Sequence, residues 1–137
     1  MTASARAAEL VRIAAEAAGD KLADDIIAYD VSEQLAITDA FVLCSAPNDR
    51  QVRAIVEEIE RRLREDADAK PVRREGEREG RWILLDYLDV IVHVQLEEDR
   101  AFYALERLWK DCPTIELPEH VNAHAAQRAA ASGGAGE

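Results

Sequence analysis

The sequence has few of the features that mark secreted or membrane-bound proteins. Its two cysteines, Cys44 and Cys112, have no Cys-x-x-Cys spacing and give no sign of a disulfide framework. No apolar run approaches the roughly 20 residues that a membrane-spanning helix needs. The first residues lack the charged and then apolar pattern of a secretory signal. The composition therefore predicts a cytoplasmic protein in which Cys44 is a small buried apolar residue.

Cations are scarce relative to acids. The chain has 17 Lys and Arg against 28 Asp and Glu, a formal net charge of −11. Because a nucleic-acid-binding protein must neutralise phosphates with cations, this balance argues against direct binding to nucleic acid, DNA included, and fits a basic partner or no partner at all. At 137 residues the chain is expected to form one domain. A chain of this length buries roughly two thirds of its unfolded surface and needs no metal or disulfide to hold its core.

The most apolar and β-branched stretch is residues 82–94, which two acids divide into strand-length halves. This pattern predicts a tight β-hairpin at the centre of a sheet. In the first arm Trp82, Leu84 and Asp86 share one face. In the second arm His93 shares a face with Asp89 and Ile91. Both faces of both arms are largely apolar, which indicates a sheet covered on both sides.

The remaining chain supplies elements to pack on this hairpin. Helical periodicity predicts helices over residues 4–18, 48–67 and 97–109, and the last of these has a buried stripe ending in Leu108 and Trp109. Alternation predicts strands over residues 26–31, 41–45 and 71–75. The order is therefore α-β-β-α-β-β-β-α, a single α/β (α+β) domain with a mixed five-stranded sheet. Residues 114–137 are expected to form a disordered tail, which leaves residues 1–113 as the domain.

The residues of this sequence give little support for a catalytic or cofactor-binding site. Asp86 and Asp89 bracket the hairpin turn and are candidates for a divalent cation, although acids at turns are commonly structural. His93 has no second ligand at metal-binding spacing, and a packed histidine is the simpler interpretation. Ser45 precedes a helix, but Pro47 removes a donor where a phosphate would need one. We expect no catalytic residues, no bound metal and no cofactor.

A protein-binding surface is the better interpretation of the hairpin. Trp82, Leu84 and Tyr87 are large side chains beside acids, and an apolar anchor with a charged rim is what a protein–protein hot spot requires. The alternative is that Trp82 is a core residue.

Several motifs resemble the ribosomal silencing factor family, also called Iojap or RsfS. They are Ile37-Thr38-Asp39, Asn48-Asp49-Arg50-Gln51-Val52-Arg53-Ala54-Ile55, Trp82-Ile83-Leu84-Leu85-Asp86-Tyr87, Asp89-Val90-Ile91-Val92-His93-Val94 and Leu105-Glu106-Arg107-Leu108-Trp109. The resemblance covers about residues 5–112. The sequence departs from the family pattern at Ala40, at Ala46-Pro47 and at Leu88, where a glycine is common.

The resemblance implies a nucleotidyltransferase-like sheet in a protein that is a homodimer when free. Because the acids Asp86 and Asp89 are three apart rather than in Asp-x-Asp spacing, it implies the scaffold without its chemistry. It also implies binding to the universal large-subunit ribosomal protein number fourteen, which blocks subunit joining and represses translation when nutrients are short. The partner-binding residues would be Trp82, Leu84, Asp86, Tyr87, Asp89, Glu97 and Glu98. The alternatives are a nucleotide- and Mg²⁺-binding enzyme and a dimeric large-subunit biogenesis factor.

Overall fold

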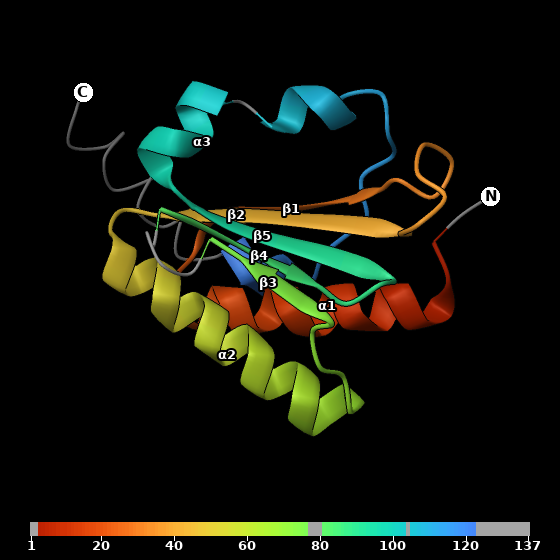
Figure 1. Ribbon diagram of the computed structural model, residues 1–137, viewed down its shortest axis with the longest axis horizontal. Coiled ribbons are helices and arrows are strands. Elements are labelled where there is room, and N and C mark those ends of the chain that lie inside the picture. The colour runs from red at the N-terminus through yellow and green to blue at the C-terminus, as the bar shows by residue number, and fades with distance from the viewer. Residues whose placement is uncertain (1–2, 77–80, 104, 123–137) are drawn as a thin grey trace.

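A five-stranded mixed sheet with helices on both sides organises the chain (Figure 1). The computed structural model describes residues 3–76, 81–103 and 105–122. Its elements are α1 (Ala5–Asp20), β1 (Asp24–Asp30), β2 (Ala40–Ala46), α2 (Asp49–Ala67), β3 (Arg73–Glu75), β4 (Trp82–Asp86), β5 (Val90–Leu96), α3 (Glu97–Tyr103) and the 3₁₀ helices η1 (Leu105–Trp109) and η2 (Glu119–Asn122). This order and the mixed sheet confirm the predicted fold class.

The sheet has the strand order β1-β2-β5-β4-β3. Strands β2 and β5 run parallel at its centre, and the other neighbouring pairs are antiparallel. The predicted hairpin is β4–β5, joined by a tight turn in which the Asp89 N–H donates to the Tyr87 carbonyl at 2.9 Å. Leu88, between them, has a φ of 71°. It therefore occupies the left-handed region that favours glycine.

The two long helices begin where the sequence offers caps. The Ser4 hydroxyl accepts from the Ala7 N–H at 3.0 Å at the start of α1, and Asn48 accepts from the Gln51 N–H at 2.9 Å at the start of α2. Such side chains satisfy backbone donors that have no partner within the helix. Helix α2 ends at Asp68, whose φ of 52° turns the chain back toward the sheet.

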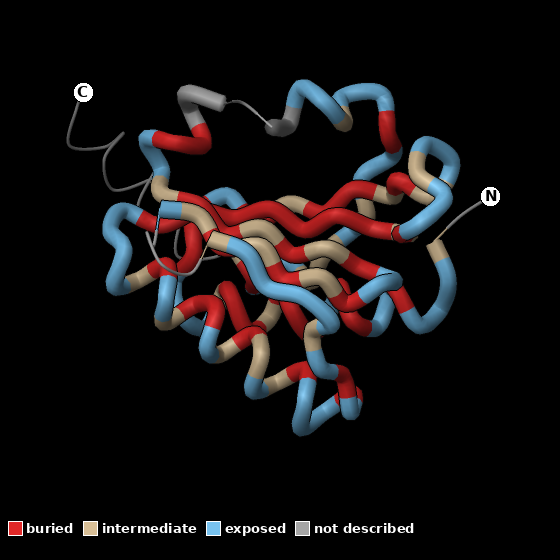
Figure 2. Tube along the Cα trace, viewed as in Figure 1, coloured by how far each residue is buried: buried red, intermediate tan, exposed pale blue. Residues whose placement is uncertain are grey.

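Helices α1 and α2 cover one face of the sheet and form the main core with it (Figure 2). Alternate residues of the central strands point into this core, among them Val42 and Cys44 of β2 and Val92 and Val94 of β5, all fully buried. Burial raises the pKa of the Cys44 thiol to about 12. Cys44 is therefore a neutral apolar residue, as expected from the sequence.

The chain beyond residue 113 continues to pack on the domain. The Pro113 carbonyl accepts a hydrogen bond from the Asp30 N–H of β1, and the Ile115 N–H donates to the Ala28 carbonyl of the same strand, each at 2.8 Å. The side-chain amide of Asn122 binds both the N–H and the carbonyl of Ile26 at 3.0 Å. These contacts pair the outer edge of β1, which would otherwise present open backbone groups to solvent. The packed chain thus extends to Asn122, beyond the expected boundary at residue 113.

Close approach between α1 and η2 depends on a glycine. A Cβ on Gly19 would lie 2.7 Å from the Val121 carbonyl oxygen, too near for any side chain. Val121 itself is 2% exposed and belongs to the main core. Gly19 was expected to end the first helix, but α1 continues through it to Asp20.

The predicted helix over residues 97–109 is described as two pieces, α3 and η1. Leu108 was expected on its buried stripe and is instead 67% exposed. Trp109, by contrast, packs on the sheet, with its ring centroid 5.6 Å from that of Phe41. The 3₁₀ winding of η1 replaces the helical period on which the prediction rested. Three other members of the stripe, Ala101, Phe102 and Leu105, have side chains outside the described part of the structure.

Candidate functional site

The sheet face that α1 and α2 do not cover is built from rows of residues on neighbouring strands. Cα partners across a ladder share a face, so the strand register defines these rows. Taken from β1 to β4, they are Tyr29–Phe41–Ile91–Asp86, Ile27–Leu43–His93–Leu84 and Asp24–Ser45–Gln95–Trp82.

The β1–β2 half of this face is buried. Tyr29, Phe41 and Leu43 form a second, smaller core with Cys112, and Trp109 packs against it. The segment after α3 therefore covers this half.

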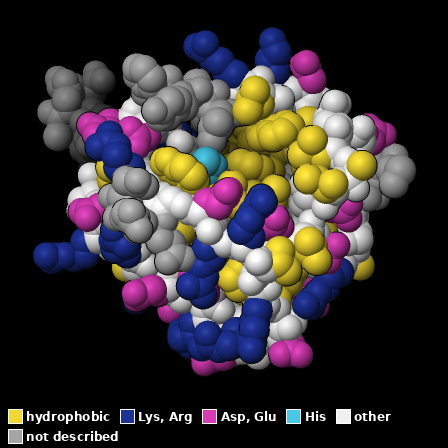
Figure 3. Space-filling model, in the orientation of Figure 1, with side chains coloured by type: hydrophobic (Ala, Val, Ile, Leu, Met, Phe, Trp, Pro, Cys, Tyr) yellow, Lys and Arg dark blue, Asp and Glu magenta, His cyan; other side chains and the backbone are white. Residues whose placement is uncertain are grey.

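The β4–β5 half is open in part. Trp82, Leu84, Ile91 and His93 are half-buried, and we call these four residues the apolar strip. Figure 3 shows hydrophobic side chains gathered on the viewed face of the molecule.

His93 behaves as an aromatic member of the strip. Its ring lies between those of Trp82 and Phe41, with centroid distances of 5.5 and 6.1 Å and edge-on geometry. Its Nε2 atom is buried and has no hydrogen-bond partner in the described part of the chain. Desolvation by burial lowers the pKa of His93 from 6.5 to about 4. The imidazole is therefore neutral at physiological pH, and its place among aromatic rings favours the packed interpretation over a ligand or a base.

Acidic side chains lie at both ends of the strip. Asp86 and Asp89 stand at the hairpin turn, whereas Glu97 and Glu98 begin α3 at the opposite end of β5. The rise of a strand places these two groups about 25 Å apart. The Asp86 carboxylate accepts from the Leu88 N–H at 2.8 Å and lies 3.6 Å from the Arg73 guanidinium. Asp89, Glu97 and Glu98 are exposed.

A buried polar row anchors α3 beside the strip. Arg100 donates to the Ser45 hydroxyl at 3.2 Å and to the Asp24 carbonyl at 3.3 Å, and all three residues are buried. Arg81, just before β4, donates to both carboxylate oxygens of Asp99, at 2.8 and 3.1 Å. These contacts fix the start of α3 against the ends of β2 and β5. The sequence analysis did not single them out, because the partners come from distant segments.

Tyr87 differs from the other predicted contact residues. It is 6% exposed and packs in the main core on the side of α1 and α2, away from Trp82 and Leu84. Strand alternation explains this, since Tyr87 follows Ile83 and Leu85 on the opposite face. Its hydroxyl is buried with no hydrogen-bond partner among the described residues, and burial raises its pKa. The strand register thus puts Trp82, Leu84 and Asp86 on the open face, whereas Tyr87 lies in the core.

Sequence reasoning missed His93 as a neighbour of Trp82, and it missed Ile91, Phe41 and Trp109 as parts of the same side of the sheet. Alternation within the hairpin already placed Ile91 and His93 on one face, and the antiparallel register places that face beside Leu84. The contributions of β2 and η1 carry no such local signal.

The arrangement offers little to a metal ion. In residues 3–76, 81–103 and 105–122, no group of three or more His, Cys, Asp or Glu side chains could hold one. Asp86 already has a cationic partner in Arg73, which weakens the case for Mg²⁺ at the turn. Within the same residues no helix is long and apolar enough to cross a membrane.

Comparison with known proteins identifies the family. The sequence model described as "Ribosomal silencing factor during starvation" matches residues 4–136. The chain belongs to the ribosomal silencing factor family. It is 39% identical to the ribosomal silencing factor of Bacillus subtilis, over 82% of this chain and 95% of that protein.

Relatives of known structure share the fold. A crystal structure from Chromobacterium violaceum superposes with a TM-score of 0.71 at 34% identity, covering 74% of this chain and 84% of that one. A more distant relative is the mouse "Mitochondrial assembly of ribosomal large subunit protein 1", 31% identical over 64% of this chain and 39% of its own length. The curated silencing factors are named for a regulatory role rather than for an enzymatic activity.

Proposed function

We propose that this silencing factor binds the large ribosomal subunit through its universal ribosomal protein number fourteen and sterically blocks joining of the small subunit. Translation would then fall when nutrients are short. The observation that carries the proposal is the apolar strip, a half-buried sheet surface with carboxylates at both ends. Half-exposed aromatic anchors with a charged rim are typical of protein-binding sites.

The proposed contact residues fall into two groups, one that makes apolar contacts and one that supplies charge. Trp82 and Leu84 supply apolar area, and Asp86, Asp89, Glu97 and Glu98 face basic side chains of the partner. A net charge of −11 suits a basic ribosomal protein, because complementary charge speeds encounter and rejects wrong partners. Tyr87 supports the hairpin from the core. We also propose that the free protein is a homodimer in the cytoplasm.

Large-subunit assembly is a second candidate function. The name of the mouse relative refers to assembly of the large subunit. A factor that occupies the joining face during assembly would use the same strip. The two roles differ only in when the protein binds the large subunit, and they therefore predict the same contact residues. Neither role requires catalysis.

Subunit joining tests the proposal directly. Purified large and small subunits are mixed with increasing protein and separated on a sucrose gradient. We expect whole ribosomes to decrease and free subunits to increase. An unchanged profile at saturating protein would refute the silencing role, and co-sedimentation with large subunits alone would then leave assembly as the function.

Substitutions in the strip test its part in the contact. Trp82→Ala should weaken large-subunit binding by about 2 kcal/mol or more, roughly thirtyfold, because a desolvated anchor is lost. A fully buried tryptophan would instead cost about 3–5 kcal/mol of folding stability. Leu22→Ala is the matched control, since Leu22 is 55% exposed outside the strip. Normal binding by folded Trp82→Ala protein would place the contact elsewhere.

A further inference from the structure

A surface cavity of about 360 Å³ lies between the second half of α2 and the segment that leads into β3. Three of its lining residues are cations and one is an acid: Glu60, Arg64, Ala69, Lys70, Pro71 and Arg74. A second cavity of about 180 Å³ shares Glu60 and Arg74 with it and adds one cation, Arg53, and one acid, Glu57. We call the two together the basic groove.

The groove lies in the part of the chain where cations are concentrated. Residues 50–74 hold 8 of the 17 Lys and Arg but 6 of the 28 Asp and Glu, so this segment is net positive while the rest carries the acidity. Figure 3 shows Lys and Arg side chains gathered in the lower half of the viewed face. The net charge of the whole chain therefore conceals a local surface of opposite sign.

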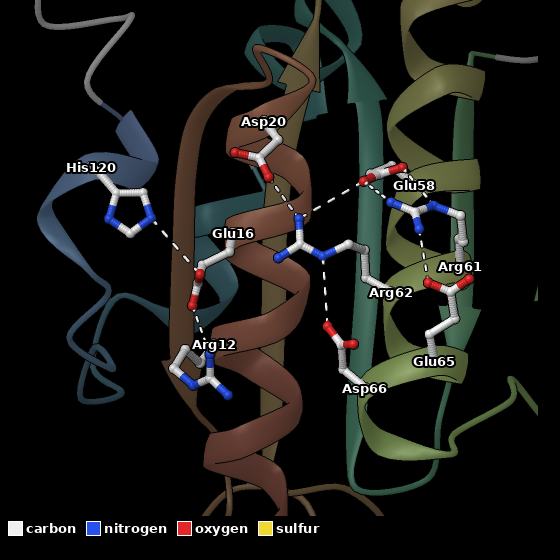
Figure 4. A network of polar contacts seen from close by, with 9 residues as sticks. All are labelled: Arg12, Glu16, Asp20, Glu58, Arg61, Arg62, Glu65, Asp66 and His120. Carbon is white, nitrogen blue, oxygen red and sulfur yellow. Dashed lines mark hydrogen bonds and ion pairs between the residues drawn. The ribbon is translucent and has the colours of Figure 1, made fainter.

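Ion pairing separates Arg64 and Lys70 from two other arginines of α2. Arg61 pairs with Glu58 and Glu65 at 2.7 and 2.8 Å, and Arg62 pairs with Asp20 at 2.6 Å (Figure 4). Arg64 and Lys70, by contrast, make no ion pair or side-chain hydrogen bond with any residue that the structure describes. Both are exposed. The groove thus presents two charges that have no counterion among the described residues.

Two acids and a buried hydroxyl complete the surroundings of the groove. Glu60, which lines both cavities, is already engaged with the Arg74 guanidinium. Glu57 lines the smaller cavity and is exposed. The buried Tyr87 hydroxyl, which has no partner among the described residues, lies within the electrostatic influence of Glu60, Arg74 and Arg64. The larger cavity, which Arg64 and Lys70 line, therefore has one acid in its lining, and that acid already has a cationic partner.

The groove is next to the apolar strip, around the edge of the sheet. Successive residues of a strand point to opposite faces. Arg73 therefore reaches Asp86 on the open face, whereas Arg74 reaches Glu60 of α2 on the other. A large partner docked on the strip would extend past this edge and come near the groove.

We propose that the basic groove contacts a phosphate of ribosomal RNA when the protein is docked on the large subunit, with Arg64 and Lys70 as the contacting cations. This inference rests on the proposed function. The last turn of α2 places about half a negative charge nearby, which two free cations outweigh but which disfavours a tightly held free nucleotide. A single salt-sensitive backbone contact, secondary to the protein contact, also agrees with the acidity of the whole chain.

Salt dependence of binding tests the contact. The variant Arg64→Gln/Lys70→Gln removes both charges, and Lys21→Gln/Arg50→Gln removes two exposed charges near the start of α2, about 20 Å away by helical rise. Binding to isolated large subunits is measured between about 50 and 200 mM salt. We expect the groove variant to bind about tenfold more weakly at low salt, with a salt slope smaller by about 1. The control should match wild type, and both variants should unfold at the wild-type urea midpoint.

A second arm separates RNA from protein as the source of the effect. Binding to the isolated ribosomal protein should be the same for wild type and the groove variant. An equal loss in that arm, or equal affinity and slope for the groove and control variants on large subunits, would overturn the RNA contact and leave the proposed function standing. Failure of the wild type itself to bind large subunits would refute the proposed function.

Discussion

Acidification should destabilise this protein through protonation of His93. The pKa of His93 is about 4 in the folded chain and 6.5 without the burial. Because the folded-state pKa is the lower one, the unfolded chain binds the proton more readily. The stability is therefore complete above pH 6.5 and is lost as the pH falls toward 4. Each pKa unit corresponds to about 1.4 kcal/mol, so the complete loss is about 3 kcal/mol and the loss at pH 5 is about 2 kcal/mol.

Urea unfolding at pH 8 and pH 5 measures this loss. The matched variant is His93→Gln, whose side chain stays neutral over the whole range. Other ionisable groups contribute equally to both proteins, so the difference between them isolates His93. We expect the wild type to lose about 2 kcal/mol more than the variant between the two pH values. Parallel losses would show that protonated His93 is accommodated between Phe41 and Trp82 after all.

Two further predictions concern the core and the C-terminal segment. Tyr87→Phe should keep or raise the free energy of unfolding, by up to about 1 kcal/mol, because it removes a buried hydroxyl that has no partner among the described residues. A loss of about 1 kcal/mol or more would reveal a hydrogen bond to this hydroxyl. Truncation after Asn122 should leave the melting temperature unchanged, whereas truncation after Cys112 should lower it by several degrees, because Val121 and the Asn122 bonds to β1 are then lost. Equal melting temperatures for the two truncations would contradict the packing of residues 113–122.

The sheet face and the groove give this family member two surfaces of different sign. The strip and its acids suit a basic protein, whereas Arg64 and Lys70 suit an anion. A ribosomal subunit presents both protein and RNA within a short distance of each other. The two surfaces meet at β3, where Arg73 and Arg74 point to opposite sides of the sheet. Binding energy from the strip would bring the groove to its phosphate, so the second contact adds specificity for the intact subunit.

Local signals in the sequence determined the elements of this protein and their order. Ser4 and Asn48 cap α1 and α2 through contacts within three residues, and alternation along residues 82–94 sufficed to predict the hairpin. Three of the five family motifs lie in α2 and in residues 82–94, which is why the family could be inferred before the fold. The same alternation held the information that Tyr87 follows Ile83 and Leu85 into the core.

Tertiary structure alone decided how distant segments meet. The strand order placed Phe41 beside Ile91 and made a single face from β2, β4 and β5. Closure of the β1 edge by Asn122 joins residues 96 positions apart. Whether Arg64 has an ion-pair partner among the described residues likewise depends on which acids the fold brings to α2. Sequence periodicity reports which side of an element is apolar. It carries no information on which partner covers that side, because the pairing depends on the free energy of the whole packed chain.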